Sequence, residues 1–151
     1  MAAEGAEATQ AAQAARAAQA SEESTMPKTV PTGPGLEPGS FPFSKVVEAN
    51  GFVFLAGQIG DAPGSQGPVP GGIEAETRAM LDNVGRLLRA VGLGYRDVVK
   101  CTVYLTDFDE FAAMNAVYRE VFPTEPPTRA TVAVSRLALG ARIEIEVIAA
   151  R

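Results

Sequence analysis

Residues 127–149 constrain the fold of this chain more than any other stretch, because apolar and polar residues alternate along two segments of it. A period of two places successive side chains on opposite faces of a β-strand. In the first segment Arg129 and Thr131 share a face, and in the second Glu144 and Glu146 share one. A short loop with a glycine joins the segments, so we expect one strand pair that presents the arginine and the carboxylates together.

An arginine and a carboxylate on one sheet face can hold a small carboxylate substrate and a water molecule together. The planar guanidinium of Arg129 can donate two parallel hydrogen bonds to a carboxylate, a geometry that lysine does not reproduce. Charges on the polar face of a half-buried sheet are more often simply solvated. The pattern alone is therefore compatible with a binding site and with an ordinary exposed surface.

Composition excludes several classes of function. The 151 residues suffice for one domain, and a formal net charge of −5 argues against a partner held through phosphates, so we expect no nucleic acid. There is no histidine and only one cysteine, Cys101, which excludes an intrachain disulfide and fits a reducing, cytoplasmic location. Cys101 lies in an apolar segment, where a core role is expected. No apolar run approaches the ~20 residues that span a bilayer, so no membrane partner is expected.

The chain is predicted to have an extension at residues 1–40 and a folded domain at 41–151. Residues 1–25 are rich in alanine but lack large apolar side chains, which predicts a loosely attached helix. They resemble neither a secretory signal nor a good mitochondrial presequence, because they lack an apolar core and carry glutamates. Residues 27–40 have the Pro and Gly content of a linker.

The remaining pattern predicts an α+β domain. Asn50-Gly51 between two apolar runs indicates a hairpin, and apolar residues at steps of three and four predict a helix over 72–91. A strand over 97–105 follows, and Asp107 with Glu110 has the form of a capping box before a second helix. That helix is predicted to turn Phe111, Met114, Tyr118 and Val121 inward and to end by Pro123. The order is β-β-α-β-α-β-β, with both helices on one face of a mixed sheet. The strand over 97–105 should bury one face, comprising Val99, Cys101, Val103 and Leu105.

The 127–149 stretch resembles the signature of the Rid family, also called the YjgF family, of reactive-intermediate deaminases. The signature has Thr-Arg-Ala before an alternating strand and Ile-Glu-Ile after a loop, and both stand here, at 128–130 and 143–145. Four further blocks extend the resemblance over roughly residues 41–151: Ala56-Gly57-Gln58-Ile59, Leu81-Asp82-Asn83-Val84, Thr102-Val-Tyr-Leu-Thr-Asp107 and Asn115-Ala-Val-Tyr118.

The resemblance implies a chorismate-mutase-like fold that packs as a homotrimer, with the uncovered sheets around a threefold axis and ligand pockets between neighbouring chains. It also implies hydrolysis of reactive imino and enamino acids, such as 2-aminoacrylate, to 2-oxo acids and ammonia. Since such substrates are already electrophilic, no metal or cofactor is expected.

Each role in that reaction can be carried over to a matching position. Arg129 would bind the substrate carboxylate, and Glu144 would orient and deprotonate the attacking water or relay a proton to the leaving amine. Backbone groups at Gly57 and Thr131 would contact the substrate nitrogen. Asn115 matches a position that lines the pocket, although it fits equally well as a polar residue on a helix face.

Three positions depart from the commonest family pattern. Phe43 stands where well-known members have Tyr, Thr131 where many have Cys, and Ala56 where many have Ser. The changes at Phe43 and Ala56 remove hydroxyl groups, and the departures put the substrate range in doubt. One alternative is a trimer that binds small carboxylates, or acts like a chaperone, without turnover. A deaminase for a larger, less polar acid is another, and a ribonuclease is the least favoured, because histidine is absent and the net charge is negative.

Overall fold

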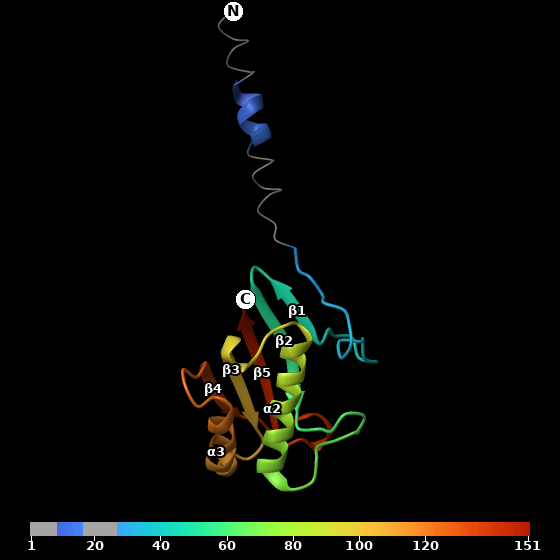
Figure 1. Cartoon of the computed structure of the whole chain (residues 1–151), viewed down its shortest axis with the longest axis vertical. Coiled ribbons are helices and arrows are strands. Elements are labelled where there is room, and N and C mark those ends of the chain that lie inside the picture. Colours follow the sequence, from blue (N-terminus) through green and yellow to red (C-terminus); the bar gives the residue numbers. More distant parts are fainter. Residues whose placement is uncertain (1–8, 17–26) are drawn as a thin grey trace, which may run out of the picture.

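The computed structural model describes residues 9–16 and 27–151 (Figure 1). Residues 9–16 form a helix, which agrees with part of the helix predicted over 1–25. The other residues of that predicted helix lie outside the described ranges. None of the helices in the described ranges is both long and apolar enough to cross a bilayer.

The domain is a five-stranded mixed sheet with two helices, α2 and α3, on one face (Figure 1), as the sequence predicts. The strands lie in the order β1-β2-β5-β3-β4. The helices and strands are β1 (Val46–Ala49), β2 (Phe52–Ile59), α2 (Gly72–Ala90), β3 (Val98–Leu105), α3 (Phe111–Val121), β4 (Thr128–Ala133) and β5 (Ile143–Ala150).

The predicted hairpin at Asn50-Gly51 joins β1 to β2. Ala49 pairs with Phe52 across the turn, and both turn residues have positive φ, 52° for Asn50 and 79° for Gly51. Asn and Gly are the residues that adopt this conformation at low cost, so this local sequence determines the turn. The register set here places Val53 and Leu55 in the core.

Strands β4 and β5 are not a hairpin, which corrects the first expectation from the sequence. β3 lies between them, pairing antiparallel with β5 and parallel with β4. Parallel neighbours need a crossover connection, and α3 provides it between β3 and β4. Residues 134–142 then return the chain past the end of β3. There the Val134 N–H donates to the Leu105 carbonyl, and the Thr106 N–H donates to the Arg142 carbonyl.

The core lies between the sheet and the two helices. α2 contributes Met80, Leu81, Val84 and Leu88, and α3 contributes Met114 and Val117, all at most 2% exposed. These side chains pack on the inward residues of β3 and β5, which are Cys101, Val103, Leu105, Ile143, Ile145 and Val147. Cys101 is thus a buried core residue, as predicted, and burial raises the pKa of its thiol.

Two local predictions differ from the structure. The register of β3 against β5 shifts between Val98 and Lys100, so Val98 is buried and Val99 is exposed, contrary to the predicted alternation. Only half of the predicted capping box forms: Asp107 Oδ1 accepts a hydrogen bond from the Asp109 N–H at 2.9 Å. Glu110 instead pairs with Arg142, at 2.7 Å, because the return loop brings that arginine to the start of α3.

The face of the sheet opposite the helices is partly apolar and open. Phe52, Phe54 and Val132 on this face are each at least 40% exposed, and Glu144 and Glu146 share it. Exposed aromatic and branched side chains gathered on one sheet face are typical of a surface that another chain covers.

Part of the segment predicted as a linker packs on the domain. Thr29 forms a two-way backbone bridge with Glu48 of β1, and Leu36 is buried in the core. Lys45 Nζ donates to the Gly35 carbonyl at 3.2 Å. Residues from Thr29 onward therefore contribute to the folded unit, before the predicted start at Phe41.

Candidate active site

Arg129 lies on the helix side of the sheet, stacked on aromatic side chains of α3. Its Cζ is 4.5 Å from the ring centroid of Tyr118 and 5.6 Å from that of Phe111. Among the described residues the guanidinium has no ion pair and no hydrogen bond. A half-buried cation held by two aromatic faces keeps its N–H groups free for an anionic ligand.

A cleft of about 340 Å³ opens beside this guanidinium. We call it the Arg129 cleft, and its lining residues are Asn115, Tyr118, Arg119, Phe122, Pro126, Pro127 and Arg129. Asn115 and Arg129, which the sequence predicted as site residues, thus line one cleft. A lining of proline and aromatic side chains with an amide and guanidinium groups is typical of a site for a small polar molecule.

Two buried polar atoms near this cleft lack partners within the described structure. They are the hydroxyls of Tyr118 and Thr131. The Tyr118 hydroxyl lies by the Cys101 thiol, and burial raises the pKa of Tyr118. Thr131 follows Arg129 by two positions on the same face of β4, beside Val103 of β3. Unpaired buried hydroxyls are uncommon, and since that of Tyr118 faces the Cys101 thiol, the Thr131 hydroxyl is the one that counts as available to a ligand or a water.

Glu144 lies on the open face, directly over Gly57. A methyl group at position 57 would collide with the Glu144 carboxylate, which would then have to move from this position. The register of β2 against β5 also shifts between Leu55 and Gln58, which brings this part of β2 beside Glu144. Burial raises the pKa of Glu144, and the neighbouring Glu146 raises it further. A carboxyl with a raised pKa is better suited to accept and return a proton near neutral pH.

Within one chain Arg129 and Glu144 face opposite sides of the sheet, which corrects the predicted shared face. Arg129 of β4 pairs with Cys101 of β3, which pairs in turn with Val147 of β5. Cys101 and Val147 are buried against the helices, so the Arg129 side chain lies on the helix side of the sheet as well. Glu144 pairs with Tyr104 on the other side. The error follows from the assumed hairpin, because alternation shows which residues of a strand share a face but not how two separate strands are aligned.

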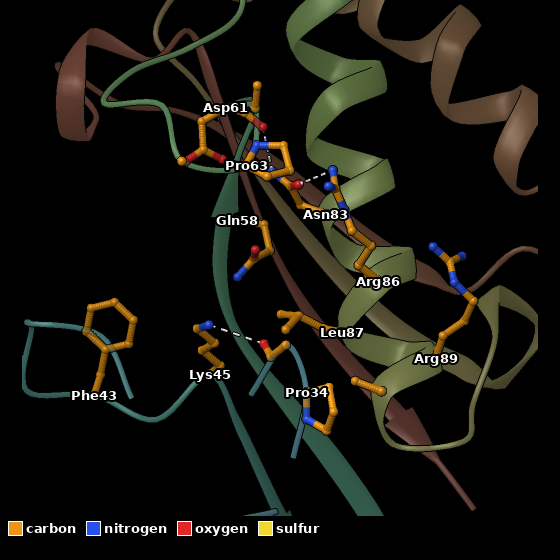
Figure 2. Close-up of a pocket in the computed structure, with 14 residues that line it drawn as sticks. Pro34, Phe43, Lys45, Gln58, Asp61, Pro63, Asn83, Arg86, Leu87 and Arg89 are labelled. Atoms are coloured by element: carbon orange, nitrogen blue, oxygen red, sulfur yellow. Dashed lines mark hydrogen bonds between the residues drawn. The ribbon is translucent and has the colours of Figure 1, made fainter. Parts of the chain in front are cut away.

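Phe43 and Ala56 lie in a third place. Phe43 is 61% exposed and stacks on Phe41, with ring centroids 6.3 Å apart. It lies at one side of another cleft, between the segment that precedes β1 and helix α2 (Figure 2). Ala56 is half-buried in β2, where its N–H donates to the Lys45 carbonyl at 2.9 Å.

The sequence did not reveal the contacts that hold Arg129. Tyr118 and Phe111 were predicted only as inward residues of a helix, and both do pack inward, but against the arginine as well as the core. The connection from β3 to β4 through α3 is the signal that could have predicted these contacts. A helix that connects two parallel neighbouring strands packs over them, so α3 lies over β4 and its side chains reach Arg129.

This arrangement defines a class: an α+β domain with an arginine cleft on the helix side and a carboxylate over a glycine on the open side. The chain is matched over residues 37–151 by the family model described as Endoribonuclease L-PSP. It belongs to that family, the YjgF or Rid family, as the sequence resemblance predicted.

Known relatives agree with this assignment. A RutC family protein of Pyrococcus horikoshii is 45% identical to this chain over 108 residues. The aligned region covers 72% of this chain and 86% of the Pyrococcus protein. A 2-iminobutanoate/2-iminopropanoate deaminase of Capra hircus is 41% identical over 108 residues, covering 72% of this chain and 79% of its own. The crystal structure of E. coli TdcF with bound serine has a TM-score of 0.71 at 36% identity, covering 79% of this chain and 96% of that one.

Proposed function

We propose that this protein is a deaminase that hydrolyses 2-imino and 2-enamino acids, such as 2-iminopropanoate and 2-aminoacrylate, to 2-oxo acids and ammonia. The observation that carries the proposal is the Arg129 guanidinium, which is held on Tyr118 and Phe111 in a cleft and is without an ion pair in the described structure. The names of the deaminase relatives and the serine bound by TdcF, an amino acid with a carboxylate, support it.

The substrate carboxylate would accept two hydrogen bonds from Arg129. Charge-assisted bonds of this kind contribute about 1.5–3 kcal/mol each, which is enough to orient a molecule of a few heavy atoms. Asn115 lies in the same cleft, where its amide would bond the carboxylate or the substrate nitrogen. Thr131 would offer its unpaired hydroxyl or its backbone to the substrate nitrogen.

Hydrolysis then needs one water and one proton acceptor. An enamino acid first takes a proton at carbon to become the imine. Water adds to the C=N carbon while Glu144 takes one proton from it and passes that proton to the nitrogen, which gives a carbinolamine. The hydroxyl proton of the carbinolamine then moves to the amine as the C=O bond forms and the C–N bond breaks, releasing ammonia and leaving the 2-oxo acid. The raised pKa of Glu144 favours this exchange of protons.

Because Arg129 and Glu144 face opposite sides of one sheet, a site that uses both must combine two chains. We propose a homotrimer in which the open faces pack together, and in which the Arg129 cleft of one chain meets Glu144, Gly57, Ala56 and Phe43 of the next. The exposed Phe52, Phe54 and Val132 of the open face support such packing.

The first experiment couples a pyridoxal-phosphate serine or threonine dehydratase to the purified chain and follows 2-oxo acid release in competition with semicarbazide, which traps the imine. We expect the wild-type chain to accelerate release and Arg129→Ala to lose the acceleration. An Arg96→Gln control, at an exposed arginine elsewhere, should behave as wild type. Equal activity of Arg129→Ala and wild type would remove Arg129 from the site.

Subunit complementation tests the shared site directly. Arg129→Ala and Glu144→Gln should each be inactive alone. When the two variants are co-expressed at equal levels and assemble at random, three quarters of the trimers contain both variants. Each mixed trimer has one intact site of three, so activity should recover to about one quarter of wild type. A site built within one chain would recover nothing.

A second candidate is a trimer that binds small carboxylates in the same cleft without turnover. The loss of polar groups at Phe43 and Ala56 favours it. Two measurements distinguish this binding protein from a deaminase: it would bind a 2-oxo acid in a way that depends on Arg129, and it would not accelerate imine hydrolysis. Ribonuclease activity, which the description of the family names, has less support here because the chain has no histidine and a net charge of −5.

For location we propose the cytoplasm. The lone cysteine, Cys101, is free and buried in the core, as is usual in a reducing compartment. Imaging of the chain with a C-terminal fluorescent fusion tests this; a signal confined to an organelle would contradict it.

A further inference from the structure

A second cleft, of about 630 Å³, lies between α2, the segment that precedes β1, and the end of β2 with the loop that follows it (Figure 2). Its volume is in the range of small-molecule sites, and it is lined by chain segments from four parts of the sequence. We call it the basic cleft and define it by Lys45, Gln58, Asp61, Asn83, Arg86, Leu87 and Arg89. Apart from Phe43 at its outer side, no residue predicted for the deaminase reaction lines it.

The charge of this cleft opposes that of the chain. Lys45, Arg86 and Arg89 stand against one carboxylate, Asp61, although the whole chain has a formal net charge of −5. Elsewhere in the described structure, arginines such as Arg78, Arg142 and Arg151 are paired with glutamates. The three cations of the basic cleft have no such ion pair among the described residues.

Hydrogen bonds hold two of these cations without neutralising them. Arg86 Nη2 donates to Asn83 Oδ1 at 2.7 Å, and Lys45 Nζ donates to the Gly35 carbonyl at 3.2 Å. Both acceptors are neutral, so the positive charges persist while the side chains are oriented. Each cation also has further N–H groups available to a ligand.

Asn83 fixes the wall next to Arg86. Its amide nitrogen donates to the carbonyls of Ile59 and Asp61, at 3.0 and 3.1 Å, and to Asp61 Oδ1 at 2.8 Å. One Asp61 oxygen is thereby engaged, which reduces its competition for Arg86. Glu37, outside the cleft, is likewise engaged by the Gly35 N–H at 3.1 Å. The cleft is thus prepared for an anion before any ligand arrives.

The side chains of the basic cleft come from its two sides (Figure 2). The Lys45 amine is directed to the Gly35 carbonyl with Leu87 beside it, the Arg86 guanidinium lies against Asn83, and Gln58 stands between these two cations in the view. Pro34 and Pro63 stand at the ends of the cleft, and the guanidinium of Arg89 is turned away from Lys45. Two cations that line one cleft without an ion pair in the described structure match a doubly charged anion, and the leucine and prolines match an apolar body. We propose that the basic cleft binds a small organic phosphate, with the phosphate between Lys45 and Arg86 and an apolar or aromatic body on Leu87.

The test is calorimetric titration of the full chain with phenyl phosphate at constant ionic strength, so that screening does not vary. We expect saturable binding that Lys45→Gln and Arg86→Gln each weaken by at least about fivefold, since each removes one charge-assisted partner. The control Arg96→Gln, whose side chain is 92% exposed on another part of the surface, should bind as wild type. Inorganic phosphate and benzoate, as separate probes, should each bind more weakly than phenyl phosphate.

Arg129→Ala separates this proposal from the deaminase function, because the Arg129 cleft also attracts anions. Binding of phenyl phosphate that survives in Arg129→Ala and weakens in Arg86→Gln and Lys45→Gln supports the basic cleft. Binding that is lost in Arg129→Ala and kept in the other two overturns it, as does the absence of saturable binding. Benzoate binding as tightly as phenyl phosphate would overturn the assignment to phosphate. None of these results depends on imine hydrolysis.

Discussion

The guanidinium of Arg129 lies 4.5 Å from the ring centroid of Tyr118, whose own side chain is almost fully buried in the core. A long cationic side chain loses much conformational freedom on binding a ligand, and an aromatic face that holds it beforehand reduces that loss. The relationship makes Tyr118 a positioning residue for the proposed carboxylate clamp. It also ties the site to the core, because the Tyr118 ring packs at a tilt against that of Phe122, with ring centroids 4.7 Å apart.

Replacing Tyr118 should weaken substrate binding through Arg129. We expect Tyr118→Leu to lower kcat/KM by about fivefold to thirtyfold, the equivalent of losing a cation–π contact of about 1–2 kcal/mol, mainly through KM. Tyr118→Phe keeps the ring and removes a hydroxyl without a partner in the described structure, so it should retain nearly full activity. Steady-state kinetics of both variants is the measurement. Equal losses in Leu and Phe would show that the ring is not what positions Arg129.

Gly57→Ala should displace the Glu144 carboxylate. The added methyl group collides with the flexible end of that side chain, so we expect kcat to fall at least tenfold while the free energy of unfolding changes by less than about 1 kcal/mol. Gly67→Ala is the matched control, because a methyl group there meets nothing nearer than 3.9 Å. Activity assays and denaturant unfolding of both variants measure kcat and the free energy of unfolding. Full activity of Gly57→Ala would mean that the position of the Glu144 carboxylate is unimportant for the reaction.

Glu144 should impose a pH dependence on activity and stability. If Glu144 acts as the base, activity requires its carboxylate form and should fall with decreasing pH through a pKa above the ordinary 4.5. A raised pKa in the folded state means that the folded chain binds this proton more tightly than the unfolded chain. The contribution to stability is therefore most favourable below the unfolded pKa and decreases as pH rises through the folded one.

Glu144→Gln removes that charge at every pH. We expect the variant to bind a 2-oxo acid, to lose turnover, and to unfold at a higher temperature than wild type at pH 7 but not below pH 4. Thermal melts at both pH values and equilibrium binding measure this. Equal loss of binding and turnover would point to a structural role for Glu144.

Val132→Asp should dissociate the proposed trimer. Val132 is 42% exposed on the open face, and a carboxylate buried between chains there would have no partner. Leu139→Asn is the control: Leu139 is 62% exposed in a loop, and its φ of 57° is tolerated by asparagine. Light scattering after size exclusion should give a monomer for Val132→Asp and a trimer for wild type and control. A trimeric Val132→Asp would place the interface elsewhere.

The local elements of the fold could be predicted from the sequence. Asn50-Gly51 specified its turn because few other residues adopt positive φ at both positions, and the periodicity of α2 and α3 identified their buried faces. Arg129, Glu144 and Gly57 were singled out from the sequence because the residue types and spacing match one family, and their roles in a site stay predictions. Each of these depends on neighbours along the chain.

Only the tertiary structure decided which side of the sheet each group faces. Alternation places Arg129 with Thr131, and Glu144 with Glu146, but the relation between the pairs depends on the insertion of β3 between β4 and β5. The stacking of Arg129 on Tyr118, and the presence of Lys45 and Arg86 in one cleft, also join segments far apart in sequence. The physical reason is that periodicity encodes the direction of a side chain relative to its own strand or helix, whereas strand order is set by how the whole core packs.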